Sequence, residues 1–237
     1  MAQPQIAPAT NGLLAALSQR DLLRLQPLLK RVPLRLKAML SVSTRPIDYA
    51  YFPEDGMISL VQPLAEGSTT EVGLVGREGF FGVPLLHGVK RSPIEAMVQV
   101  EGTGLRIRAR DLIAEVARSE TLRTLLLRYA EAIHIQTAQI AACNVRHPLG
   151  KRLMRWLLEA DDRMRPKPLN LSHEFLSMML GIRRAGVTSA LGSLRREGVI
   201  EMGVGVVRIR DRAALEAATC DCYAASKKEA ASALQGR

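Results

Sequence analysis

Two arginines occupy a position that helix stability does not favour. Arg183 and Arg184 lie in the first turn of a predicted helix, shortly after Gly181. A positive charge there opposes the helix dipole and costs about 0.3–1 kcal/mol. An anionic partner would account for both residues. An arginine at the start of a helix can also donate a bidentate pair of hydrogen bonds to O6 and N7 of guanine.

The same helix combines an apolar stripe with a face of small residues. Val187, Leu191 and Leu194 recur at helical spacing and form the stripe. Small, hydroxylated or basic residues face the other way, and such a face can approach the floor of a DNA groove closely. The residues that we expect to contact double-stranded DNA are Arg183, Arg184, Ala185, Thr188, Ser189 and Arg196.

The segments around this helix predict a winged helix-turn-helix. Ser172 is suited to cap a preceding short helix, and Gly181 is suited to end it. Two predicted strands, 198–202 and 206–210, follow the second helix and are joined by a turn with two glycines. Helix, turn, helix and hairpin in this order are typical of a DNA-binding domain.

Cysteine and histidine provide a second set of candidate residues. Cys143 and His147 are four residues apart, and Cys220 and Cys222 form another pair. Two ligands do not make a structural zinc site, and the end of a predicted helix interrupts the first pair, so we expect no metal and no cofactor. The chain has neither a glycine-rich phosphate loop followed by Lys and Ser or Thr nor the motif of a catalytic triad, so an enzyme is not expected.

Composition and charge also point to an anionic partner. The chain has 237 residues, with 33 Lys and Arg against 23 Asp and Glu, and a formal net charge of +10. Seven basic residues and one acidic residue lie between Arg163 and Arg196. No apolar run approaches the roughly 18 residues of a membrane span. With no signal-peptide pattern and only three cysteines, we expect a cytoplasmic protein without disulfides and without a membrane partner.

The N-terminal half predicts short strands after an initial helical region. Leucines recur at near-helical spacing over residues 11–40, and strands are expected at 57–61 and 69–75. Residues 94–100 and 105–110 alternate in polarity around Gly102 and Gly104, which predicts a hairpin. Several short strands with glycine turns favour a small barrel or jelly roll.

A long helix is predicted from Ser119 for about 25 residues. Its apolar seam can pack either on a second copy of the chain or on the strands of the same chain. We favour a homodimer, because apolar residues occur on both faces of this helix. The residues expected at the dimer interface are Leu122, Leu126, Tyr129, Ile133 and Ile140.

The order of these segments resembles the Crp/Fnr family of bacterial transcription regulators. The resemblance is most specific over residues 171–200, with Gly181, Arg184 and the Val187-Thr188 pair at the family's positions. It implies an α+β fold with three parts: a cyclic-nucleotide-binding-like β-barrel (jelly roll), a long central dimerisation helix and a C-terminal winged helix-turn-helix. The corresponding domains are 1–118 (sensor), 119–146 (dimerisation helix) and 147–237 (DNA binding).

The resemblance also implies an effector site in the barrel. Arg91 and Ser92 match the family's pair that holds a cyclic phosphate, and Gln136 and Thr137 match a region that contacts the purine. The acidic residue expected to hold the ribose falls near Phe81, and Glu78 can serve only after a shift. Pro93 removes a backbone amide beside the phosphate position. We therefore expect that the protein does not bind cyclic AMP.

The sequence thus predicts a homodimeric, sequence-specific DNA-binding transcription regulator, with an effector as a candidate ligand of the barrel and RNA polymerase as a candidate partner. The alternative is a small-molecule-binding signalling protein, for example one that binds a cyclic nucleotide, whose basic tail is incidental.

Overall fold

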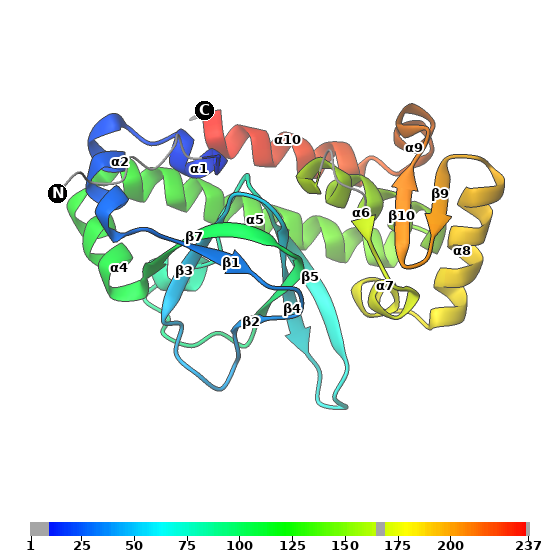
Figure 1. Cartoon of the computed structure of the whole chain (residues 1–237), viewed down its shortest axis with the longest axis horizontal. Coiled ribbons are helices and arrows are strands. Elements are labelled where there is room, and N and C mark those ends of the chain that lie inside the picture. Colours follow the sequence, from blue (N-terminus) through cyan, green and yellow to red (C-terminus); the bar gives the residue numbers. More distant parts are fainter. Residues whose placement is uncertain (1–9, 165–168, 236–237) are drawn as a thin grey trace.

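The computed structural model describes residues 10–164 and 169–235. The molecule is elongated, with strands toward one end, the helix-turn-helix toward the other, and one long helix running between them (Figure 1). None of the helices in the described ranges is both long and apolar enough to cross a membrane.

The N-terminal part consists of two antiparallel sheets with short helices around them. One sheet has the strand order β1-β7-β3 and the other β2-β6-β4-β5. The strands are β1 (Lys30–Leu34), β2 (Met39–Ser41), β3 (Tyr49–Pro53), β4 (Met57–Pro63), β5 (Thr69–Val75), β6 (Glu95–Val100) and β7 (Gly102–Arg108). The helices are α1 (Gly12–Ala15), α2 (Gln19–Leu25), the 3-10 turn η1 (Gln26–Leu28), α3 (Val83–Leu86) and α4 (Ala109–Arg118).

The C-terminal part contains helices and a small three-stranded sheet. Helix α5 (Glu120–Arg146) leads into it from the strands. The elements that follow are α6 (Leu149–Met164), β8 (Leu169–Asn170), α7 (His173–Leu180), α8 (Arg184–Arg196), β9 (Ile200–Gly203), β10 (Val206–Ile209), α9 (Arg212–Ala218) and α10 (Cys222–Gln235). The last helix, α10, runs back along α5 (Figure 1).

Two expectations about the N-terminal part were wrong. Residues 11–40 form only short helical pieces followed by β1 and β2, because Pro27 and Pro33 limit continuous helix and the leucines at 13, 14 and 25 reach the core from separate elements. The expected hairpin does not form either. β6 pairs with β2 and β4, whereas β7 pairs with β1 and β3, so the chain crosses between sheets at Gly102.

The described residues form two large hydrophobic cores, and helices α5 and α6 each contribute buried residues to one of them. The first lies between the N-terminal sheets and includes Phe52, Phe80 and Tyr129 of α5. The second surrounds Trp156 of α6 and takes in Met57 and Leu74 from the strands. The winged-helix part is therefore packed on the β2-β6-β4-β5 sheet rather than separated from it.

The expected long helix is confirmed, but the predicted dimer seam is not available in this chain. Ser119 caps α5, with its hydroxyl accepting from the backbone N–H of Leu122 at 3.2 Å. The five predicted interface residues are turned toward the chain itself. Four are buried and Ile133 is partly buried, so the seam packs within one subunit. The five residues are Leu122, Leu126, Tyr129, Ile133 and Ile140. This packing is the alternative that the sequence left open for the seam.

Candidate nucleic-acid interface

The helix-turn-helix is formed by α7 and α8. The hydroxyl of Ser172 accepts from the backbone N–H of Phe175 at 3.1 Å and caps α7. Gly181 ends α7 in the left-handed conformation, with φ of +61°. The turn positions α8 so that Val187, Leu191 and Leu194 are buried against the domain core. These local signals were all visible in the sequence.

The opposite face of α8 is solvent-exposed, as the helical spacing predicts. Arg183 is the N-cap residue of α8 and makes no side-chain cap hydrogen bond. All six residues expected at DNA lie on the exposed surface: Arg183, Arg184, Ala185, Thr188, Ser189 and Arg196. They are gathered along one helix, which gives a convex surface of the kind that enters a major groove.

Two of these side chains are held by neighbours on the same surface. The hydroxyl of Thr188 donates to the carbonyl of Arg184 at 3.1 Å and lies 2.9 Å from Nδ1 of His173. Arg196 lies 3.4 Å from the hydroxyl of Ser193. Among the described residues, no acidic side chain forms an ion pair with Arg183 or Arg184. Both guanidinium groups are therefore free to meet an anion.

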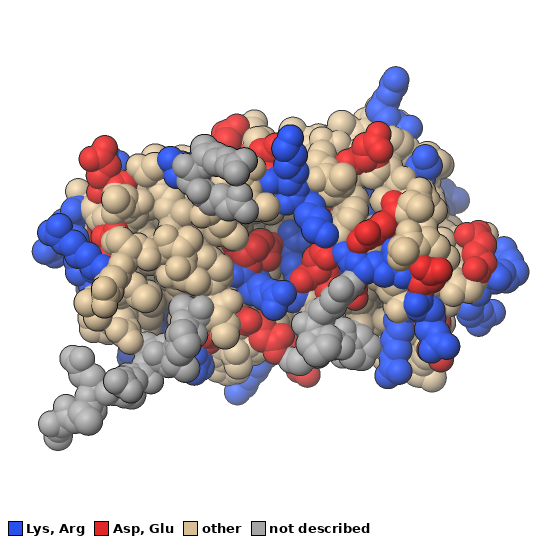
Figure 2. Space-filling view, turned by 90° about the horizontal axis from the view of Figure 1, so that it is seen from above, with Lys and Arg blue, Asp and Glu red and all other residues tan. Residues whose placement is uncertain are grey.

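The hairpin next to α8 adds basic residues. β10 pairs antiparallel with both β8 and β9, and Val204 at the turn is fully exposed. Arg208 on β10 and Arg210 directly after it are both exposed, and Arg210 lies 3.4 Å from Glu201. Lys and Arg side chains project from the end of the molecule where α8 and this hairpin lie (right in Figure 2).

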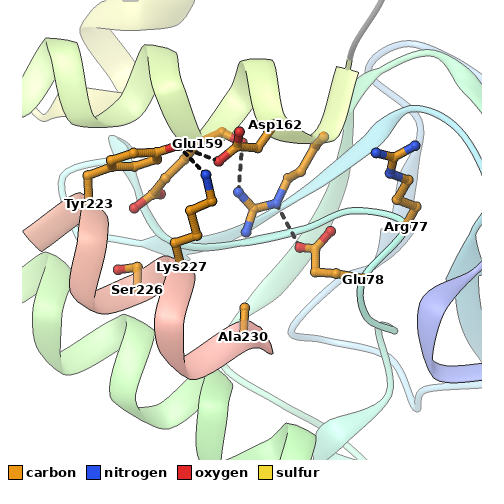
Figure 3. A pocket seen from close by; sticks show the side chains of 9 residues that line it. Arg77, Glu78, Glu159, Asp162, Tyr223, Ser226, Lys227 and Ala230 are labelled. Carbon is orange, nitrogen blue, oxygen red and sulfur yellow. Dashed lines mark hydrogen bonds and ion pairs between the residues drawn. The ribbon is translucent and has the colours of Figure 1, made fainter. Parts of the chain in front are cut away.

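Part of the basic excess counted in the sequence has an internal role. Arg163 is nearly buried, and its Nε donates to Glu78 at 2.7 Å. Arg163 of α6 and Glu78 both line a pocket of about 310 Å³. Figure 3 shows this pocket, with Glu78 in the loop after β5. The other wall comes from α10, whose Tyr223 donates to Asp162 at 2.8 Å. Arg165 and Lys167 lie outside the described residues.

The residues expected to bind an effector are not brought together. Glu78 pairs with Arg163, Arg91 is exposed, and Ser92 is buried beside a different cavity. On α5, the amide oxygen of Gln136 accepts from the backbone N–H of Leu74 at 3.1 Å, and the hydroxyl of Thr137 donates to the carbonyl of Val72 at 3.1 Å. Gln136 and Thr137 thus join α5 to β5.

The cavity beside Ser92 is small and apolar. Its volume is about 100 Å³, and its walls include Phe80, Phe81, Ile94 and Ile133. Pockets for drug-sized ligands are typically about 300–1,000 Å³. A cyclic nucleotide does not fit this cavity without rearrangement of the protein.

A buried carboxyl group joins the strands to the helix-turn-helix part. Ser59 and Trp156 both hydrogen-bond to Glu71 at 2.7 Å, and Trp156 belongs to α6. Burial raises the pKa of Glu71 to about 8. Sequence reasoning missed this contact, because an isolated glutamate in a strand gives no sign that a tryptophan far along the chain will cover it.

Sequence reasoning also treated the two cysteine and histidine pairs separately. The structure places Cys143, His147, Cys220 and Cys222 together, with their candidate ligand atoms all within 4.8 Å of one another. The signal was present as two short ligand spacings. The contact between α10 and α5 that unites them was not visible in the sequence.

Comparison with known proteins adds an independent observation. Residues 151–218 match the model of the Crp-like helix-turn-helix domain. The transcriptional regulator LdrP of Thermus thermophilus is 32% identical over 169 residues, which cover 70% of this chain and 85% of LdrP. The LdrP of a second strain of that species gives the same identity and coverage. These relatives are transcriptional regulators.

Solved structures share the same architecture. FixK2 from Bradyrhizobium japonicum superposes with a TM-score of 0.70 at 17% identity, covering 81% of this chain and 98% of that chain. A transcriptional regulator of the CRP family from Thermus thermophilus gives a TM-score of 0.63 at 23% identity, covering 88% and 100%. At these identities the likeness concerns the fold, and it confirms the expected α+β architecture.

Proposed function

Because this chain belongs to the Crp/Fnr family of transcriptional regulators, we propose that it is a sequence-specific DNA-binding regulator that acts in the cytoplasm as a homodimer. The observation that carries the proposal is the outer face of α8. Arg183 and Arg184 are exposed at its start, small residues follow them, and the hairpin of β9 and β10, which carries Arg208, lies beside it. An arginine in this position can read guanine, and the hairpin cations can neutralise phosphates.

A homodimer is supported by a second face of α5, different from the one predicted. Exposed residues recur on this face at alternating spacings of four and three, which is the spacing of a coiled-coil seam. They are Leu127, Glu131, His134, Ala138, Ala141 and Val145. Leu127 is 43% exposed and Val145 is 83% exposed, which is unusual for large apolar residues on a long helix.

The small residues in this face favour a second copy of α5 as the occupant. Ala138 and Ala141 allow two helices to approach closely, and a two-fold axis along α5 presents two α8 helices to one DNA duplex. Half-sites in such complexes are about 34 Å apart, or one turn of DNA. RNA polymerase remains a candidate partner of the DNA-bound dimer.

Effector control of the N-terminal sheets is a separate part of the proposal. The small apolar cavity beside Ser92 is the place where a small ligand could act, since its lining includes Phe80 from the N-terminal part and Ile133 from α5. The alternative of a cyclic-nucleotide signalling protein is not supported, because Arg91 is exposed and Glu78 is held by Arg163.

The test is a selection of DNA fragments by the purified full-length chain, followed by titrations of the selected site at several salt concentrations. We expect enrichment of a palindromic site and a steep loss of affinity with rising salt. Enrichment of no sequence, together with tight binding of a nucleotide, would instead favour the alternative.

A further inference from the structure

Four metal-ligating side chains meet at the junction between α5 and α6. Cys143 lies in the last turns of α5 and His147 is its C-cap residue. Cys220 lies in the connection from α9 to α10, and Cys222 is the first residue of α10. The three thiols are buried and the histidine is half-buried, so the cluster has one edge near solvent.

The backbone holds each pair in position. The N–H of His147 donates to the carbonyl of Cys143 at 3.0 Å, so the two side chains emerge on the same side of the helix end. The N–H of Tyr223 donates to the carbonyl of Cys220 at 3.1 Å and closes a turn that brings Cys220 and Cys222 together. Contact between α10 and α5 then places one pair against the other.

Two separations among the four ligand atoms match a tetrahedron around one ion, and all four atoms lie within 4.8 Å of one another. Sγ of Cys143 lies 3.7 Å from Sγ of Cys220, and Sγ of Cys222 lies 3.5 Å from Nδ1 of His147. With Zn–S bonds of about 2.3 Å and Zn–N bonds of about 2.0–2.1 Å, a tetrahedral zinc ion separates two sulfurs by about 3.8 Å and a sulfur from a nitrogen by about 3.5 Å. Both observed separations agree with these values.

We propose that Cys143, His147, Cys220 and Cys222 form a structural zinc site. Three cysteines and one histidine are an established ligand set for structural zinc, and closed sites with four protein ligands are the structural kind. Thiolate and imidazole ligands in tetrahedral geometry select zinc over magnesium or calcium. The ligands of an iron–sulfur cluster are divided between at least two iron atoms, and ligands on different irons lie farther apart than the 4.8 Å span of this group.

The surroundings can balance the charge of the loaded site. Three thiolates and one divalent ion leave one negative charge. Arg152 and Arg155 on α6 lie beside Cys143. Arg152 also donates to Asn144 at 3.0 Å, which fixes it beside the end of α5. Such outer partners orient metal ligands and tune their affinity.

A zinc ion here would tie two helices together. It would join the end of α5 to the start of α10, directly beside the point where α6 begins. The winged-helix part begins with α6. The metal would therefore hold the C-terminal helix α10 against the long helix α5 close to the start of that part. Metal binding would therefore contribute to folding stability.

The test uses the full-length chain, reduced and purified without chelator. Elemental analysis should find one zinc per chain, and titration with Co²⁺ should give the intense visible absorption of a tetrahedral ion with thiolate charge-transfer bands in the near ultraviolet. Cys222→Ser and His147→Gln should each weaken Co²⁺ binding by about tenfold or more. His87→Gln, at an exposed histidine in the N-terminal part, is the matched control and should bind like the wild type.

Thermal unfolding keeps the proposal testable even where a variant folds poorly. A chelator should lower the Tm of the wild type and of His87→Gln, and it should have less effect on His147→Gln. The proposal is overturned if the reduced, folded wild type binds neither Zn²⁺ nor Co²⁺. It is equally overturned if Cys222→Ser and His147→Gln bind Co²⁺ like the wild type, or if Cys143 and Cys220 form a disulfide in place of the metal site. DNA binding is not a readout, so failure here leaves the proposed function standing.

Discussion

At the scale of single residues, Arg184 is the side chain best placed to read a base. It lies in the first turn of α8, is exposed and has no acidic partner among the described residues. We expect Arg184→Ala to weaken binding of the selected site by about 1–3 kcal/mol and to relax the preference at one base pair of each half-site. Fluorescence anisotropy on the selected site and on random DNA measures both effects.

Arg196→Ala is the matched control for this prediction. Arg196 lies in the last turn of α8, where a guanidinium is suited to a phosphate rather than to a base. Its loss should weaken both DNAs similarly and make affinity less dependent on salt. An equal loss on both DNAs for Arg184→Ala would mean that Arg184 contacts only the backbone.

Glu71 gives a prediction about pH. Burial raises its pKa from the ordinary 4.5 to about 8, so the folded chain keeps a proton that the unfolded chain loses between these values. Stability should therefore fall as pH rises through this window, on the order of 1 kcal/mol per pH unit. Glu71→Gln should remove most of this dependence and be more stable than the wild type at about pH 8.

Urea unfolding at about pH 5 and about pH 8 checks the Glu71 prediction. Glu66→Gln, in the exposed turn between β4 and β5, should leave the pH dependence as it is in the wild type. A Glu71→Gln variant with an unchanged pH profile would show that Glu71 is ionised in the folded chain.

The residue scale also shows where sequence reasoning ends. Arg183 and Arg184 could be identified because their exposure depends on local features, namely the spacing of residues along α8 and the position at its start. Arg163 looked like part of the same basic surface, yet it is nearly buried against Glu78. Nothing near Arg163 in the sequence indicates that partner, because only the tertiary fold brings the loop after β5 to α6.

At the scale of elements, the turn between α7 and α8 depends on Gly181. Its φ of +61° is costly for a residue with a side chain. We expect Gly181→Ala to destabilise the chain by about 1 kcal/mol and to weaken DNA binding, since the turn sets the angle of α8. Thermal unfolding and DNA titration measure the two effects.

Gly192→Ala is a matched substitution that is expected to change stability in the opposite direction. Gly192 lies inside α8, and a Cβ there would be 3.7 Å from the Arg196 guanidinium, an ordinary contact. The helix should gain about 0.5–1 kcal/mol because alanine is a better helix former than glycine. If both variants shifted stability in the same direction, backbone conformation would not be the cause.

Elements were predicted well where they are self-contained. The long helix, α7, α8 and the C-terminal hairpin follow from periodicity, caps and glycine turns that lie within each segment. The pairing of β6 and β7 was predicted wrongly, because alternation identifies a strand but not its neighbour. Here β6 and β7 belong to opposite sheets, and Phe52 and its neighbours are packed in the core between these sheets.

At the scale of the whole molecule, the arrangement of the N-terminal part predicts insensitivity to cyclic AMP. Glu78 and Ser92 face different cavities, and Arg91 is exposed. Cyclic AMP at physiological concentration should change neither the Tm nor the affinity for DNA. A saturable thermal shift that disappears in Arg91→Ala would contradict this prediction.

The two faces of α5 lead to opposite predictions about the assembly. The face with Ile133 packs on the chain's own strands and lines the apolar cavity, so Ile133→Asp should destabilise the fold itself. The face with Ala138 is exposed, so Ala138→Glu should leave the subunit folded while placing carboxylates between two close helices. Sequence periodicity alone could not separate these faces, since both carry apolar residues at helical spacing.

We therefore expect Ala138→Glu to sediment as a folded monomer and to bind the palindromic site far more weakly than the wild type, because one winged helix reads only one half-site. Ala217→Glu introduces the same change at an exposed alanine of α9 and should remain dimeric with normal binding. Circular dichroism distinguishes loss of assembly from loss of fold in each variant. If Ala138→Glu still sediments as a dimer and still protects both half-sites, the exposed face of α5 is not the interface. If the wild type is itself a monomer on the palindromic site, the homodimer is excluded.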